Sequence, residues 1–231
     1  MSTPITTARL TRAAGMSAVA AGLLFIVVQV ARPHDDVVFV STTAWTVTHI
    51  LGLAMAGLAL VGISGMYLRQ VTQTGRLGLV GFVLLGACFL LISASQFVEA
   101  FVLPSLTDQA PQFVSDFLAI PTGGVIVGDV WALVTVNLLT GVTYVFGGVL
   151  FGVALFRAGI LARWAALLLA AGTALALLLP LLPYALDRLT GVPVGIALAG
   201  LGFSLWREQR TAATAPTTSA GVSRTEPAGA R

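Results

Sequence analysis

Six long apolar stretches constrain the fold of this chain more than any other feature of its sequence. Each stretch is long enough to cross the hydrocarbon core of a bilayer, about 30 Å thick, as an α-helix, which takes roughly 17–25 residues. The predicted spans lie near residues 13–31, 43–67, 77–103, 129–156, 160–184 and 190–206. The sequence therefore predicts an all-α protein, a polytopic transmembrane bundle of six helices.

Arginines are concentrated in every second gap between these stretches. Those gaps and the two terminal segments carry Arg9, Arg12, Arg69, Arg76, Arg157, Arg163, Arg207 and Arg210. The alternate gaps contain only Arg32 and Arg188. Because cytoplasmic loops of membrane proteins are enriched in lysine and arginine, residues 1–12 and the C-terminus are both predicted to be cytoplasmic. Trp45 and Trp131 fall near the predicted outer surface, a depth that aromatic rings prefer.

The composition excludes a soluble globule and argues against nucleic-acid binding. Of the 231 residues, 57% are hydrophobic and 9% are charged, which leaves too little polar surface to cover a soluble domain. The net charge of +3 comes from the loop arginines, which suit a cytoplasmic membrane surface. We therefore expect the lipid bilayer, and no nucleic acid, as the surroundings of this chain. The single cysteine, Cys88, excludes an intramolecular disulfide.

Two segments outside the spans have distinct compositions. Residues 207–231 are rich in Thr, Ala, Ser, Pro and Gly without apolar periodicity, which predicts a disordered cytoplasmic tail. Residues 104–128 form the only long connection, within which residues 112–119 are predicted to form a short helix on the membrane surface. Long ordered loops carry function more often than short ones.

Small residues at helical spacing predict two packing faces, because helices in lipid associate where their backbones approach closely. The second predicted span carries Gly52 and Ala56 on one strip. The fourth carries Gly141, Gly148 and Gly152, and the last two form a Gly-x-x-x-Gly pair. Both faces are expected to point into the bundle.

Polar side chains share one depth in the predicted outer third of the membrane. At 1.5 Å per residue, His49 lies about 9 Å inward from the start of its span, and Glu99 about 6 Å from the outer end of the next. Ionisable residues inside a span cost about 2.5–3.5 kcal/mol on insertion scales, so their presence indicates a partner or a water-filled site. Similar levels are reached by Gln96, Asn137 and Gln29, with Asp129 at the rim.

This polar cluster has two interpretations, which the sequence leaves open. In the first, Glu99 or His49 binds a proton, a cation or a small ligand in an outward-facing pocket, since imidazole changes charge near neutral pH. In the second, His49 and Glu99 form an inter-helical hydrogen bond that fixes the packing register, a bond worth about 0.6–2 kcal/mol.

Four local motifs mark the ends of the predicted spans. They are Trp45 to His49, Gly65 to Gln70 with Arg76 to Gly78, Phe97 to Pro104, and Arg157 to Trp164. In their order, the chain resembles uncharacterised six-helix integral membrane proteins of bacteria over most of residues 10–206. The resemblance implies a bacterial cytoplasmic (inner) membrane as the location, but no activity and no catalytic residue.

The sequence thus predicts a non-enzymatic binding, regulatory or assembly module with an outward-facing polar cluster. An alternative is a small proton-coupled secondary transporter that uses Glu99 and His49. A lesser alternative is an intramembrane enzyme, which needs a second acid–base group close to Glu99. No catalytic, nucleotide-binding or metal-binding motif is found, and no cofactor is expected. The sequence leaves open whether the chain forms a homo-oligomer or binds a membrane partner protein.

Overall fold

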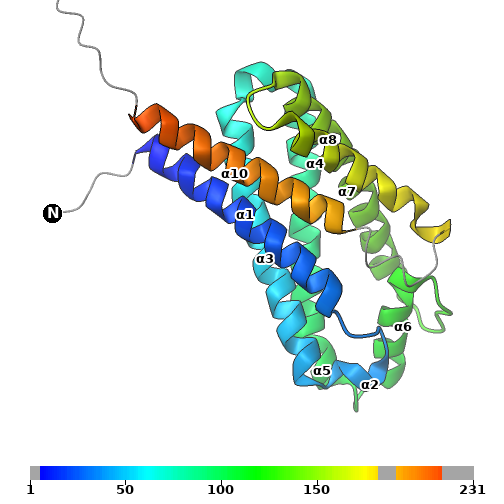
Figure 1. Ribbon diagram of the computed structural model, residues 1–231. Coiled ribbons are helices and arrows are strands. Elements are labelled where there is room, and N and C mark those ends of the chain that lie inside the picture. The colour runs from blue at the N-terminus through cyan, green and yellow to red at the C-terminus, as the bar shows by residue number, and fades with distance from the viewer. Residues whose placement is uncertain (1–5, 182–190, 215–231) are drawn as a thin grey trace, which may run out of the picture.

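The computed structural model describes residues 6–181 and 191–214, and every regular element in these ranges is a helix (Figure 1). The long helices are α1 (Thr7–Ala31), α3 (Thr43–Arg69), α4 (Val71–Phe97), α7 (Trp131–Ala158), α8 (Arg163–Leu175) and α10 (Val192–Thr214). The short elements are α2 (Val37–Val40), the π-helix η1 (Val98–Val102), α5 (Leu103–Leu106), α6 (Pro111–Thr122) and the 3₁₀-helix η2 (Ala176–Leu181). The prediction of an all-α protein is confirmed.

Among the described residues, four helical segments are long and apolar enough to cross a membrane. They are Thr7–Ala31, Thr43–Arg69, Val71–Leu106 and Trp131–Ala158, and they match the first four predicted spans. The fifth predicted span begins with the shorter apolar helix Arg163–Leu178, and its last residues lie outside the described part of the chain. α10 covers the sixth.

α10 also differs from the prediction at its C-terminal end. The helix runs past Trp206 to Thr214, so the first residues of the predicted disordered tail are helical. Arg69 of α3 forms an ion pair with Glu208 of α10, and this contact stabilises the helical form of the polar residues that follow Trp206. Residues 215–231 lie outside the described part of the chain.

The six long helices form a closed ring. Each packs against the next in the order α1, α3, α4, α7, α8, α10, and α10 returns to α1. Figure 1 shows α1 and α10 side by side, with the short helices α2, α5 and α6 together at one end of the bundle, which we name the loop end.

The arginine-bearing helix ends lie at the opposite end, which we name the arginine end. Figure 1 places the start of α1 beside the end of α10 there, with the α3–α4 and α7–α8 turns. The backbone N–H of Ala162, in the α7–α8 turn, donates to Ser204 Oγ of α10 at 3.0 Å. The arrangement in space therefore follows the alternation of charge along the sequence.

Glycines allow the helices to approach closely, as the sequence predicted for α7. A Cβ atom at Gly148 would collide with Thr173 of α8, and one at Gly152 would lie 2.7 Å from the carbonyl oxygen of Ala166. Both glycines lie at the contact between α7 and α8. Gly141 was predicted to share this face, but it is exposed and no described atom of a neighbour lies within 4 Å of a Cβ placed there. That prediction is wrong because α8 gives way to η2 before it reaches the level of Gly141.

Further close contacts join helix pairs that the sequence analysis did not identify. Gly147 of α7 faces the backbone of Leu85 in α4. In the antiparallel pair of α1 and α10, Gly15 meets Gly202 and Gly22 meets Gly195. With no side chain on either partner, these helices approach backbone to backbone, so the bundle depends on small residues on all these faces.

Candidate functional site

Three polar side chains from α3, α4 and η1 form one hydrogen-bonded cluster, which we name the His–Gln–Glu triad. His49 Nδ1 lies 2.6 Å from Glu99 Oε2. The amide of Gln96 donates from Nε2 to the same carboxylate oxygen at 2.9 Å, and its Oε1 lies 3.1 Å from His49 Nδ1. The structure therefore brings together the histidine, glutamine and glutamate that the sequence placed at one depth.

The triad is buried, and His49 takes part in it through Nδ1. His49 is 1% exposed and Glu99 is 8% exposed. His49 Nε2 is buried and has no hydrogen-bond partner among the described residues. The ring is therefore held from the Nδ1 side, which faces both Gln96 and Glu99.

Glu99 lies in a π-helical turn, and the backbone there depends on a tryptophan. Within η1 the N–H of Leu103 donates to the carbonyl of Val98, five residues back. The next donor in that pattern belongs to position 104, where proline has no N–H. The Glu99 carbonyl oxygen instead accepts a hydrogen bond from Trp45 Nε1 at 2.8 Å. π-Turns inside α-helices occur frequently at functional sites.

Trp45 faces the interior of the bundle. It is fully buried, and its ring centroid lies 4.3 Å from that of His49. The predicted depth of Trp45 stays a prediction, but its indole N–H is satisfied inside the bundle by a backbone carbonyl and does not face the membrane surface. Trp131, predicted at the same surface, is 70% exposed.

Gly52 gives the triad its space. A Cβ at this position would overlap the side-chain amide of Gln96, so glycine lets that amide reach between His49 and Glu99. Ala56, one turn along α3, is fully buried in the main core. Both residues of the predicted strip thus face the interior of the bundle.

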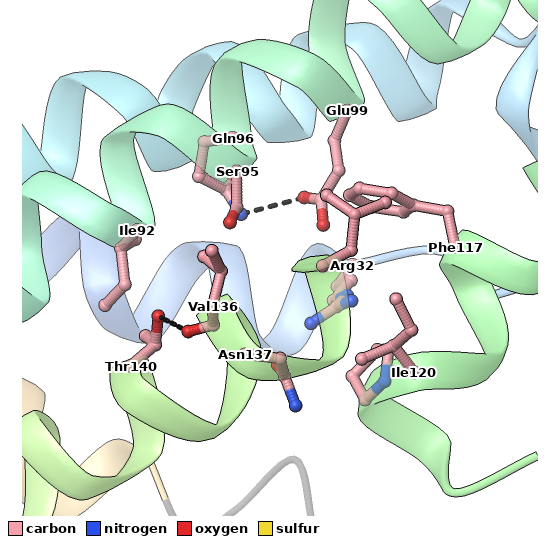
Figure 2. Close-up of a pocket in the computed structure, with 12 residues that line it drawn as sticks. Arg32, Ile92, Ser95, Gln96, Glu99, Phe117, Ile120, Val136, Asn137 and Thr140 are labelled. Atoms are coloured by element: carbon pink, nitrogen blue, oxygen red, sulfur yellow. Dashed lines mark hydrogen bonds between the residues drawn. The ribbon is translucent and has the colours of Figure 1, made fainter. Parts of the chain in front are cut away.

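The triad borders a cavity of about 220 Å³ near the loop end, which we name the polar cavity. Its polar lining comes from the end of α1 and from α4, η1 and α7: Arg32, Ser95, Gln96, Glu99, Asn137 and Thr140. Phe117, Ile120 and Pro121 of α6 close the opposite wall. Figure 2 shows the Glu99 carboxylate and the Gln96 amide on one side, with Arg32 between them and Asn137.

A second, larger cavity of about 690 Å³ adjoins the first. We name it the apolar cavity because Phe25, Leu138, Val145, Phe146 and Leu177 belong to its wall. Five residues line both cavities: Arg32, Ile92, Pro121, Asn137 and Thr140. The two spaces are therefore neighbours that meet at a partly polar boundary.

The remaining predicted residues lie apart from the triad. Gln29 lines the apolar cavity, and Asn137 lines both. Asp129 is exposed in the segment before α7 and lines neither. The rim position predicted for Asp129 therefore stays a prediction, while Asp116 and α6 contribute to the same end of the bundle.

Sequence reasoning did not identify Arg32 or the α6 wall as parts of the site. The guanidinium Nη2 of Arg32 bonds to Asp35 Oδ1 at 2.8 Å, at the edge of the polar cavity. The available signal was the position of Arg32, one of the few arginines outside the arginine-rich gaps. The α6 wall had no comparable signal, because apolar residues of a surface helix look alike whether they face lipid or a cavity.

Asp116 orders the segment that follows α6. Its carboxylate accepts the backbone N–H groups of Val127 at 3.0 Å and Gly128 at 2.8 Å, and the side-chain amide of Gln112 at 2.9 Å. The hydrogen bond from Val127 lowers the pKa of Asp116 below its ordinary value of 3.8; burial opposes this shift, and Gly128 and Gln112 reinforce it. One carboxylate thus holds the connection from the cavity wall to α7.

Asp116→Asn is expected to loosen this connection. An amide has one carbonyl oxygen and would direct its own N–H groups at a backbone donor, so hydrogen exchange at Val127 and Gly128 should accelerate by about tenfold. In the native protein the depressed pKa means that protection persists as the pH falls to 3.8 and is lost only at lower pH. Exchange measured by mass spectrometry checks both statements. Asp108→Asn, at an exposed carboxylate, is the control, and equal exchange in the two variants would contradict the assignment.

Comparisons of the chain with protein-family models, with curated proteins and with solved structures found no match. The resemblance to six-helix bacterial membrane proteins stays a prediction, and function is inferred from the geometry of the site.

Proposed function

We propose that this chain is a non-enzymatic binding module of a bacterial cytoplasmic membrane. It has six spans, both termini are cytoplasmic, and its polar cavity opens to the outer side. Glu99 receives a cationic or hydrogen-bond-donating group of a small ligand in that cavity. Four apolar helices of spanning length support membrane insertion. The position of the arginine-bearing helix ends, opposite the cavity, supports the orientation.

The observation that carries the proposal is a carboxylate held in place at a cavity wall inside an apolar bundle. Glu99 is 8% exposed and belongs to the lining of the polar cavity. His49, Gln96 and Trp45 fix its carboxylate and its backbone. An ionisable residue at membrane depth is costly and is by default a candidate for function. Orienting it from three directions is what a binding site requires.

The alternative of a proton-coupled transporter keeps one supporting observation, the direct contact of His49 with Glu99. Transport also needs a path to the cytoplasmic side. Toward the arginine end, Gly15 packs on Gly202 and Gly81 on the backbone of Phe151. These close contacts favour a site that opens to one side only, which suits binding or sensing.

Cysteine labelling in intact cells tests the proposal. In a Cys88→Ser background, Ser95→Cys places a near-isosteric thiol in the polar cavity and leaves the triad unchanged. A small, membrane-impermeant methanethiosulfonate added outside is expected to label it. The matched variant Gln73→Cys, exposed in the first turn of α4 at the arginine end, should stay unlabelled until the membrane is opened. Labelling of Gln73→Cys from outside would contradict the proposed orientation. Protection of a folded Ser95→Cys would contradict a cavity that is open to the outer side.

Reagent charge then tests the role of Glu99. A carboxylate about 4 Å from a cationic reagent in a hydrated site contributes roughly 1 kcal/mol, which corresponds to about fivefold in rate. The same carboxylate repels an anionic reagent by a similar amount, so the ratio of cationic to anionic labelling rates at Ser95→Cys is expected to fall by about 25-fold, the square of this factor, when Glu99→Gln is added. An unchanged ratio would mean that Glu99 does not act on the contents of the cavity.

A further inference from the structure

We infer that the ligand is a membrane lipid with a zwitterionic, ammonium-bearing phosphate head group, bound with its head in the polar cavity and one hydrocarbon chain in the apolar cavity. This inference rests on the proposed function and names the class of ligand. It starts from the contact of the two cavities, which share Arg32, Asn137 and Thr140 in their linings. A ligand that fills both spaces must be polar at one end and apolar at the other.

The charges of the polar cavity match such a head group. Glu99 and Arg32 line it together, so one anionic and one cationic side chain face the same space. A carboxylate suits a primary ammonium, and a guanidinium suits a phosphate through its planar set of five donors. Arg32 bonds to Asp35 through Nη2, and bonding to one carboxylate does not prevent a guanidinium, which has five donors, from contacting a second anion. A purely anionic head group has no positive group to place against the Glu99 carboxylate.

The apolar cavity is placed where a lipid chain can enter from the bilayer. Its wall includes Leu138 and Phe146 of α7 and Leu177 of η2, all of which are exposed. In a membrane these side chains contact hydrocarbon, so a chain that enters the cavity stays in apolar surroundings. A volume of about 690 Å³ also lies inside the range of about 300–1,000 Å³ that is usual for ligand pockets.

A helix from a second copy of the chain fits this site less well. An α-helix with its side chains is about 10–12 Å across, too wide to follow the apolar cavity into a neighbouring space of about 220 Å³. Such a helix would leave the polar cavity and both of its charges unused. A lipid reaches the two cavities with two parts of one molecule.

Native mass spectrometry of the full chain in detergent tests the inference, with phosphatidylethanolamine and phosphatidylglycerol of identical chains as probes. We expect one phosphatidylethanolamine to bind per chain, about tenfold more tightly than phosphatidylglycerol. Glu99→Gln should abolish most of this preference. Gly141→Leu should weaken binding of the lipid by about tenfold because the new side chain fills the apolar cavity, where Gly141 has open space. Gly57→Leu is the matched control, an exposed helical glycine with equally open space outside both cavities.

Free phosphoethanolamine separates this inference from the proposed function. Suppose that free phosphoethanolamine slows labelling of Ser95→Cys, but the chain shows no preference between the two lipids and Gly141→Leu does not weaken lipid binding. The polar binding site is then supported and the lipid inference fails. Equal binding of both lipids to the native chain and to Glu99→Gln likewise overturns the inference. If neither the lipids nor free phosphoethanolamine bind, and reagent charge has no effect at Ser95→Cys, both proposals fail. If a second copy of the chain binds at this face and no lipid displaces it, the apolar cavity is part of an oligomer interface and the lipid inference fails.

Discussion

Gly147→Leu is expected to separate α4 from α7 and to destabilise the bundle by about 3 kcal/mol or more, the upper range for overpacking a close contact. A Cβ at Gly147 would lie 2.5 Å from the backbone nitrogen of Leu85 and 2.8 Å from its Cα. A backbone cannot turn away as a side chain can. The two helices must therefore move apart, and the neighbouring contact of Gly81 with Phe151 is lost with them.

Gly141→Leu on the same helix is the control for this prediction. It makes the same change in helix propensity, a gain of about 0.8–1 kcal/mol, at a position with open space. Thermal unfolding of both variants in detergent should show a folded Gly141→Leu and a strongly destabilised or aggregated Gly147→Leu. Equal unfolding temperatures would contradict the close approach of α4 and α7.

These two glycines also show what helical spacing can predict about packing. The Gly-x-x-x-Gly pair of Gly148 and Gly152 indicated one close face of α7, and it faces α8. A helix in a closed ring has two neighbours, and Gly147, one residue along, faces the other. Spacing alone does not tell which neighbour a face meets or where that neighbour ends, so Gly141 was assigned to a contact that it does not make.

The candidate site could be predicted where depth alone decides the contact. His49 and Glu99 are polar residues in apolar spans, and a rise of 1.5 Å per residue places them at one level. Gln96 lies three residues before Glu99 and shares its helix face. Arg32 and α6 reach the cavity through connections that fold back over the loop end, and no periodicity describes that path. Trp45 donates to the Glu99 carbonyl that Pro104, without an N–H, leaves unpaired within η1. This contact follows from the relative position of α3 and η1, which the sequence pattern does not give.

His49→Leu is expected to be the most costly substitution in the triad. His49 donates to a buried carboxylate, and a hydrogen bond to a charged group contributes about 1.5–3 kcal/mol. The loss here should be near 3 kcal/mol, since Glu99 stays buried and only Gln96 still donates to its Oε2. Reversible unfolding in detergent, followed by circular dichroism, measures the change in the free energy of unfolding.

A double-mutant cycle with Glu99→Gln separates this interaction from loss of packing. The glutamine carries no charge, so the double variant His49→Leu/Glu99→Gln should be less destabilised than the two single changes together, with a coupling energy of about 1–3 kcal/mol. Thr48→Val is the matched control in α3, because the Thr48 hydroxyl is buried but bonds to the Ala44 carbonyl of its own helix. Its effect should add to that of Glu99→Gln within about 0.5 kcal/mol. Additivity for His49 as well would mean that the two side chains do not interact, and Glu99 would then be an isolated buried carboxylate whose orientation His49 does not determine.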